Sequence, residues 1–382
     1  LYLIEHHQVV YGPAPDVAKE RSIEPQLAPP HEPAVEGVTA APSLLAWLLC
    51  QKYVLHLPLY RQEDAFARLG VQISRKTLCD WVMKSAFALG IVAREIERQI
   101  RAGPVLQLDD TPIKVRRPGP GGGKPKVRQS CLWTLTNPEV PGVAFRFTEG
   151  RSTKDVASVL GPAHEGEGVD VLLGDGYQAN VSGAREAGMD VVHAGCWAHL
   201  LRKFRDALKE APRAMALFMK DIAELYAIER KARDEEMGAD ARLELRRRES
   251  LPIAVRLMRL TSGWQEHYSL EGNVADAMKY ARGQRRAFLA FLRDGRIPID
   301  NNACERAIRP IAIGRRNWLF AGSVDGAHAA ATIYTIVESA KATGVDPLAY
   351  LESVLEQLGT WPGIRSPPAH AVGDGGSTCL LY

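Results

Sequence analysis

Length, composition and charge limit the classes of protein to which this chain can belong. The 382 residues are 46% hydrophobic, which is enough for two or three domains with real cores. The 48 basic residues exceed the 45 acidic ones by only three, which excludes a histone-like polycation. Any surface for a polyanion must therefore come from local clustering of charge.

The sequence carries no signal for a membrane or for an oxidising compartment. Six cysteines are scattered without a C-x-x-C pair, which is typical of a reducing cytosol rather than of a disulfide scaffold. The longest uncharged stretch, residues 37–51, contains a proline and is too short to span a bilayer. Residues 1–25 lack a basic start followed by an apolar run. We therefore expect a cytoplasmic protein without membrane contact.

The first hundred residues divide into an arm and a helical region. Residues 1–42 hold 7 of the 24 prolines, which predicts an extended linker. Residues 43–100 begin with leucines at helical spacing, and a helix-turn-helix pattern follows within residues 61–86. Gly70 ends the first helix of this pattern and Ser74 caps the second. The predicted apolar positions are Ala65, Phe66 and Leu69 in the first helix and Leu78, Trp81 and Val82 in the second.

The second helix of this pattern would present a basic first turn to a DNA groove. The residues of that turn are Arg75, Lys76 and Thr77. An ordinary helical hairpin is the alternative, because many helix bundles have the same apolar spacing and the same glycine in the connection.

Residues 104–206 have the pattern of a mixed sheet. Three strands in series, followed by helix, strand, helix and strand, predict an α/β sheet with an antiparallel start and a parallel finish. The expected strands cover residues 105–115, 126–136, 142–150, 169–177 and 189–195, and the expected helices cover residues 152–160 and 184–187. Residues 117–125, rich in Gly and Pro, predict a hairpin loop.

The rest of the chain is predominantly helical. Residues 207–296 combine helical apolar spacing with many charges. Within them the run Arg246-Arg247-Arg248 is typical of a solvated face. Residues 297–350 contain a basic segment followed by a helix of small residues. Residues 351–382 are the predicted tail, and its Gly- and Pro-rich stretch 359–382 is expected to fray.

Three carboxylates stand out by their positions. Asp109 lies in an apolar strand, where an acid is costly without a partner. Asp175 follows a buried strand, at the edge where ligands of open α/β sheets gather, and Glu305 begins a basic helix. Hard divalent cations such as Mg²⁺ bind such carboxylates. A pair of these ions held close together promotes phosphoryl transfer. The pattern alone is weak, because large α/β proteins commonly carry acids in their strands.

Arginines are concentrated around the third of these acids. Residues 282–318 contain nine arginines and three acids. Arginine is the preferred partner of phosphate, so phosphate contact is favoured for the arginines that flank Glu305, namely Arg306, Arg309, Arg315 and Arg316. For residues 282–296 a solvated helical face is an equal alternative. Trp318 has the ring to stack on a base, although a core position is more common for tryptophan.

A second cluster of functional residue types follows the last expected strand. Cys196 and His199, with His193 just before them, invite a zinc interpretation. A second ligand pair is missing, so a structural or positioning role is favoured. Arg202 and Lys203 on the following helix are candidates for phosphate contact, with simple solvent exposure as the alternative.

Five long strings carry a resemblance to a known family. They are P-L-Y-R-Q-E-D-A-F-A-R-L-G-V-Q-I-S-R-K-T-L-C-D-W (58–81), L-D-D-T-P-I-K-V (108–115), G-D-G-Y (174–177), C-W-A-H-L-L-R-K-F (196–204) and N-N-A-C-E-R-A-I-R-P-I-A-I-G-R-R-N-W-L-F-A-G-S (301–323). In this order, from about Pro42 to Leu351, the chain resembles transposases of the insertion-sequence sixty-six family. It departs from the family pattern at Asp110, where Glu is usual, and at both ends, which lack a Cys-rich, finger-like segment and an acidic, Trp-containing tail.

The resemblance implies a fold and a set of site residues. The fold is α/β, an RNase H-like mixed sheet interrupted by an α-helical insertion and preceded by a helical helix-turn-helix domain. The implied segments are the arm (1–42), the helix-turn-helix domain (43–100), the core (104–206), the insertion (207–296), the rest of the core (297–350) and the tail (351–382). The implied DDE triad is Asp109, Asp175 and Glu305, supported by Cys196, His199, Asn301, Asn302 and Trp318.

The resemblance also implies an activity. A DNA transposase would bind the terminal repeats of its element, cleave DNA with two Mg²⁺ ions held by the triad, and transfer the 3′-hydroxyl into target DNA, with Mn²⁺ as a substitute ion. A homodimer or larger assembly, accessory element-encoded proteins and a place on the bacterial nucleoid are expected with it. The alternatives are a metal-dependent nuclease without strand transfer, a non-catalytic DNA-binding relic of a transposase, and an enzyme that does not act on DNA.

Overall fold

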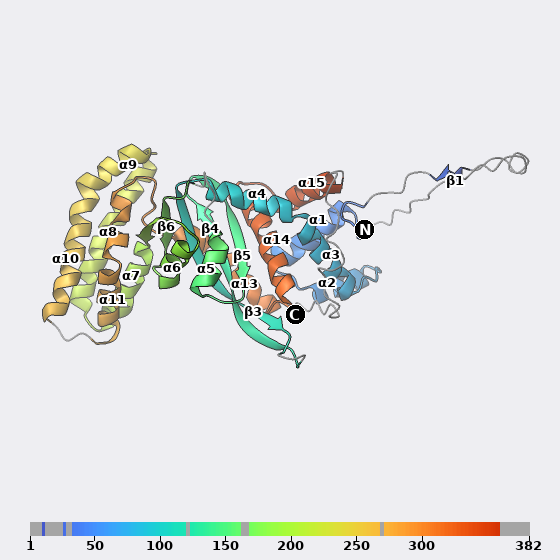
Figure 1. Ribbon diagram of the computed structural model, residues 1–382, viewed down its shortest axis with the longest axis horizontal. Coiled ribbons are helices and arrows are strands. Elements are labelled where there is room, and N and C mark those ends of the chain that lie inside the picture. The colour runs from blue at the N-terminus through green and yellow to red at the C-terminus, as the bar shows by residue number, and fades with distance from the viewer. Residues whose placement is uncertain are drawn as a thin grey trace, which may run out of the picture.

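The computed structural model describes residues 10–11, 26–27, 33–119, 123–161, 168–267 and 271–359 (Figure 1). Most of the predicted arm, the centre of the hairpin loop at 117–125 and the chain after residue 359 lie outside these ranges. Within the arm, β1 (Val10–Tyr11) and β2 (Gln26–Leu27) pair in antiparallel orientation. The sheet lies between two groups of helices, one formed largely by residues before it and one by residues that follow it (Figure 1).

The N-terminal group contains α1 (Pro42–Tyr53), α2 (Leu59–Arg68), α3 (Arg75–Ala88) and α4 (Gly90–Arg101). The predicted cap is confirmed, since the Ser74 side chain accepts a hydrogen bond from the backbone N–H of Thr77. Leu78 and Val82 are buried as predicted. The apolar role predicted for Leu69 is wrong: it lies just past the end of α2, where Gly70 adopts φ +80°, and its side chain is 69% exposed.

The central sheet has five strands in the order β5-β4-β3-β6-β7. The strands are β3 (Val105–Arg117), β4 (Lys126–Asn137), β5 (Val140–Thr148), β6 (Val171–Gly174) and β7 (Val192–Gly195). The pairs β3–β4 and β4–β5 are antiparallel, whereas β3–β6 and β6–β7 are parallel. The predicted antiparallel start and parallel finish are therefore confirmed, although β6 and β7 are shorter than the expected strands.

The two faces of the sheet follow the alternation of side chains along β3. Leu106 and Leu108 point to the face covered by α5 (Thr153–Leu160) and α6 (Gln178–Glu186). On the opposite face, Val105 packs with residues of α7 (Trp197–Asp206), and the Gln107 side chain donates to residues at the start of α13 (Asn302–Trp318). Farther along this face, α14 (Val324–Ala342) lies against β5, where Thr335 accepts the backbone N–H of Phe145.

Between α7 and α13 the chain forms a lobe of packed helices, seen at one end of the molecule in Figure 1. The elements of this lobe are η2 (Ala207–Lys209), α8 (Pro212–Asp234), α9 (Ala239–Leu245), the π-helical turn η3 (Arg246–Ser250), α10 (Leu251–His267), α11 (Gly272–Gly283), α12 (Arg285–Phe288) and η4 (Ala290–Leu292). The apolar positions Phe218, Ile222 and Leu225 on α8 are buried in its core. The helical character predicted for residues 207–296 is thus confirmed over the part that the structure describes.

The solvated face predicted for the arginine run is wrong for its first member. Arg246 is completely buried, and its guanidinium pairs with Glu229 on α8 at 2.6 Å. The same group donates to the backbone carbonyls of Phe291 at 2.8 Å and Asp294 at 3.0 Å. Burial of Arg246 is tolerated because the Glu229 carboxylate compensates its charge and the two carbonyls accept its N–H groups. Arg247 and Arg248 are exposed as predicted.

The last described helix, α15 (Pro347–Gly359), extends into the segment predicted as a tail. Its residues Leu351, Leu355 and Leu358 are buried in the same core cluster as Leu45 and Leu49 of α1. Residues 351–359 therefore pack against the N-terminal helices.

No helix in the described ranges is both long enough and apolar enough to cross a bilayer.

Candidate active site

Strand register brings two of the predicted acids to one edge of the sheet. Gln107 of β3 is paired with Leu173 of the parallel strand β6. Asp109 and Asp175 each lie two residues beyond this pair, on the C-terminal side of β6. This is the edge at which open α/β sheets bind their ligands.

Asn301 docks the helix that carries the third acid. Its buried amide donates to the carbonyl of Leu108 at 3.0 Å, and its side-chain oxygen accepts from Gln107 at 3.3 Å. The backbone N–H of Glu305 in turn donates to the carbonyl of Asn301 at 3.2 Å, so Glu305 lies in the first turn of α13. The side-chain amide of Asn302 donates to the Asp300 carboxylate at 2.6 Å, which fixes the residues that lead into α13. Asn301 thereby fixes the start of α13 against the strand that carries Asp109.

The electrostatics of Asp109 show that the three acids are neighbours. The pKa of its carboxyl is raised to about 7, first by burial and then by the negative charges of Asp175, Asp110 and Glu305. The backbone N–H of Asp110 donates to the Asp109 carboxylate at 2.8 Å, and this hydrogen bond acts in the opposite direction by lowering the pKa of Asp109. Asp110, Asp175 and Glu305 each have an arginine partner. Within the described ranges no ion pair reaches Asp109. The result is an acid-rich site in which Asp109 is the one acid of the four without a described ion pair.

Asp110 faces away from Asn301 and Glu305, because successive residues of a strand point to opposite faces. Its carboxylate pairs with Arg151 at 2.6 Å and accepts the Cys131 thiol at 3.4 Å. Arg151 also lies 3.6 Å from Asp175 and 4.0 Å from the ring centroid of Tyr177. Sequence reasoning missed Arg151 because no motif marks it, and only the folded sheet brings it to both acids.

Replacing Arg151 by Gln should lower the free energy of unfolding by about 1–2 kcal/mol, because Asp110, whose side chain is 8% exposed, loses its counter-charge. Adding Asp110→Asn should recover most of that loss, since the more buried of the two acids that face Arg151 then carries no unpaired charge. Urea unfolding of the two variants would measure both effects. The exposed pair Arg98–Glu95 provides the control, since Arg98→Gln should change stability little. An equal loss in the single and double variants would contradict the pairing.

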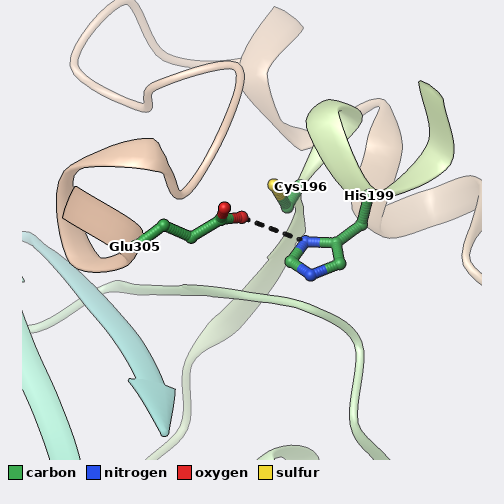
Figure 2. A group of neighbouring side chains, drawn as sticks. All are labelled: Cys196, His199 and Glu305. Atoms are coloured by element: carbon green, nitrogen blue, oxygen red, sulfur yellow. Dashed lines mark ion pairs between the residues drawn. The ribbon is translucent and has the colours of Figure 1, made fainter. Parts of the chain in front are cut away.

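Glu305 also meets the second predicted cluster. Figure 2 shows Cys196, His199 and Glu305 pointing toward one another, with Nδ1 of His199 3.7 Å from the Glu305 carboxylate. One possible ligand atom from each lies within 4.8 Å of the others, a group able to hold a metal ion. Burial, however, raises the pKa of the Cys196 thiol to about 12, and its Sγ accepts the backbone N–H of Asn301 at 3.2 Å. Through this hydrogen bond the Cys196 thiol joins the start of α7 to the start of α13. His193, in contrast, is not part of this group.

The predicted phosphate-contacting residues fall into two classes. Arg202 is ion-paired with Glu305, and Arg315 donates to Thr111 at 2.9 Å and to the Pro112 carbonyl at 2.7 Å, which clamps α13 onto β3. The other four are exposed, and these are Lys203, Arg306, Arg309 and Arg316. Trp318 is only 5% exposed and belongs to the core, so it offers no ring face to a base.

The predicted DNA-facing residues of the helix-turn-helix pattern begin α3. Lys76 is exposed, whereas Thr77 contributes to the cap through its bond with Ser74 at 2.9 Å. The backbone N–H of Arg75 donates to Glu63 on α2 at 2.7 Å, which joins the two helices. In Figure 1, α3 lies beyond α14, on the other side of that helix from β6. The structure therefore keeps this region apart from the acidic site.

Comparison with known proteins identifies the family of this chain. The model of the Transposase IS66 family matches residues 37–329, and that of the IS66 C-terminal element matches residues 335–363. The first match contains all three acids of the site and Asn301, which docks the start of α13 on β3.

Similar proteins occur in Sinorhizobium fredii. Its uncharacterized protein y4qI is 36% identical over 352 residues, which cover 88% of this chain and 62% of the relative. The uncharacterized protein y4jD is 32% identical over 337 residues, which cover 85% of this chain and 64% of the relative. The chain thus spans less than two thirds of the length of these relatives. Since the family model extends over most of its residues, the chain belongs to the Transposase IS66 family.

Proposed function

We propose that this chain is a DNA transposase, which binds element ends and catalyses metal-dependent DNA cleavage and transfer of a 3′-hydroxyl into target DNA. The observation that carries this proposal is the position of Asp109, which has no ion pair in the described ranges, beside Asp175 and Glu305 at the ligand-binding edge of the sheet. Family membership supports the choice of DNA as substrate. Because two element ends must be joined, we propose a homodimer or larger assembly on DNA.

The donor set of this site fits Mg²⁺ or Mn²⁺. Asp109, Asp175 and Glu305 offer hard carboxylate oxygens. The pKa of Asp109 is raised by burial and, to a smaller extent, by the negative charges of its neighbours, which a cation would compensate. These three residues would hold the ions. When bound, such ions supply Lewis-acid stabilisation of the developing charge on phosphate and lower the pKa of the attacking hydroxyl.

The chain's own residues position the acids. Asn301 holds the start of α13 on β3, and Arg151 and Arg202 neutralise Asp175 and Glu305 in the absence of an ion. The opposite orientation of Asp110, paired with Arg151, supports Asp109 as the acid of the triad. The strand order, with a late helix supplying the third acid, supports an RNase H-like core.

The basic surfaces support DNA binding by two regions. The connection between α2 and α3, with Lys76 exposed at the start of α3, supports a helix-turn-helix that holds the terminal repeats. Three exposed arginines on α13, namely Arg306, Arg309 and Arg316, would follow the DNA backbone beside the acids.

The proposal is tested by Glu305→Gln on linear DNA that carries candidate element ends, with Mg²⁺, Mn²⁺ or no metal. The unaltered chain should give metal-dependent cut and joined products, and the variant should lose about 10³-fold or more of this activity while it still binds DNA. Glu186→Gln, at an exposed position of α6, is the matched control and should remain active.

Each other outcome would support a different function or a different set of site residues. Cutting without joining would support a nuclease, and binding without any product would support a non-catalytic DNA-binding relic. Joining by Glu305→Gln at the control rate would remove Glu305 from the metal site.

A further inference from the structure

A cavity of about 670 Å³ opens between the sheet and the lobe of helices. Its walls come from β6 and β7, from α6, and from the segment of residues 282–293 by which the chain leaves the lobe. The sequence separates α6 from this segment by about a hundred residues, so only the fold brings them together.

The charge of this cavity is one-sided. Among its described lining residues none is Asp or Glu, and five are arginines: Arg185, Arg282, Arg285, Arg286 and Arg293. All five are exposed, and none pairs with a carboxylate in the described ranges. Like charges around one cavity repel unless an anion lies between them. We call these residues and the cavity the arginine cleft.

One arginine of the cleft also acts on a neighbouring titratable group. His193 of β7 lines the cleft, and its pKa is lowered by burial and by the charge of Arg185. The planar guanidinium of arginine binds phosphate in a bidentate manner, which makes arginine rather than lysine the side chain of choice for this anion. The cleft therefore favours a ligand that carries several phosphates.

The cleft adjoins the acidic site through the loop that carries Asp175. Gly174 and Gly176, on either side of Asp175, line the cleft. The side chain of Gln284 donates to the carbonyl of Gly176 at 3.3 Å, and the Tyr280 hydroxyl donates to the carbonyl of Asp175 at 2.6 Å. A polyanion in the cleft would thus lie against the segment that places one of the three acids.

We propose that the arginine cleft binds the sugar–phosphate backbone of the DNA strand next to the point of cleavage. This inference rests on the proposed function, because it takes the acidic site to act on DNA. Its contacts are charges aimed at phosphate, so the cleft should hold DNA of any base sequence. The lobe that separates the second acid from the third would then serve as a DNA-binding element.

The test is a binding titration with the double variant Arg285→Gln/Arg286→Gln of the full chain. Fluorescent DNA of a candidate element end and of random sequence would be titrated at several salt concentrations. We expect about tenfold weaker binding of both DNAs and a log–log salt slope reduced by about 1–2. The control, Arg213→Gln/Arg230→Gln, removes the same charge from exposed positions on α8 and should bind within about twofold of the unaltered chain.

The outcomes separate this inference from the function on which it rests. If the unaltered chain binds neither DNA at low salt, the proposed function fails. If it binds and the cleft variant keeps both its affinity and its salt slope, only the cleft is refuted. Equal losses in the cleft variant and in the α8 control would also refute it, since net charge alone would then explain binding. Melting temperatures of both variants would confirm that they are folded.

Discussion

Replacing Asp109 by Asn is expected to abolish DNA cleavage and, at the same time, to stabilise the metal-free protein. Loss of the buried carboxylate removes one of the three acids proposed to hold the ions, so activity should fall by about 10³-fold or more. A gel assay of cut and joined DNA in Mg²⁺ would measure this loss. The opposite signs of the two effects distinguish a residue that serves function at a cost in stability from one that serves packing.

The gain in stability has a defined pH dependence. The pKa of Asp109 is raised to about 7, well above its ordinary value, so its ionised form destabilises the folded chain. This penalty develops as pH rises from about 4 and is complete above about 7, where it amounts to roughly 1–3 kcal/mol. We therefore expect Asp109→Asn to melt a few degrees higher at pH 8 and at the unaltered temperature below pH 4. Calorimetry without divalent ions would measure the difference.

Asp110→Asn is the natural control for this prediction. Asp110 neighbours Asp109 in sequence but pairs with Arg151 on the other face of the sheet. We expect the Asp110 variant to retain cleavage. Retention of activity by Asp109→Asn and its loss in Asp110→Asn would exchange the roles of the two acids.

Replacing Arg246 by Met is expected to have the largest effect on stability, a loss of about 3 kcal/mol or more in the free energy of unfolding. The substitution leaves Glu229 without its counter-charge and removes the guanidinium donor from the carbonyls of Phe291 and Asp294. Urea unfolding followed by circular dichroism would measure the loss. The control is Arg247→Met, which removes an exposed arginine paired with Glu244 and should cost little.

A second variant shows whether the cost comes from the unpaired acid. Adding Glu229→Leu to Arg246→Met should recover a large part of the loss, because a buried pair replaced by apolar side chains is often neutral. A loss below about 1 kcal/mol in the single variant would contradict the role of Arg246.

Local patterns in the sequence determined the elements and their order. Ser74 was identified as a helix cap because capping depends on residues within one turn. The antiparallel start and parallel finish of the sheet followed from strands in series and then strands alternating with helices. The family strings led to the same family that the comparison identifies, since they run in order through most of the matched residues.

Only the tertiary structure decided which side chains meet. The spacing of Arg246 resembles that of its exposed neighbours, and its burial depends on Glu229 from another helix. Arg151 became a partner of two acids because the fold brings the connection between β5 and α5 to Asp110 and Asp175. Arg185 joined the arginines at 282–293 because the lobe packs back onto the sheet. Such contacts join residues far apart in the chain, and their free energy depends on burial and charge in the folded state, which no local periodicity encodes.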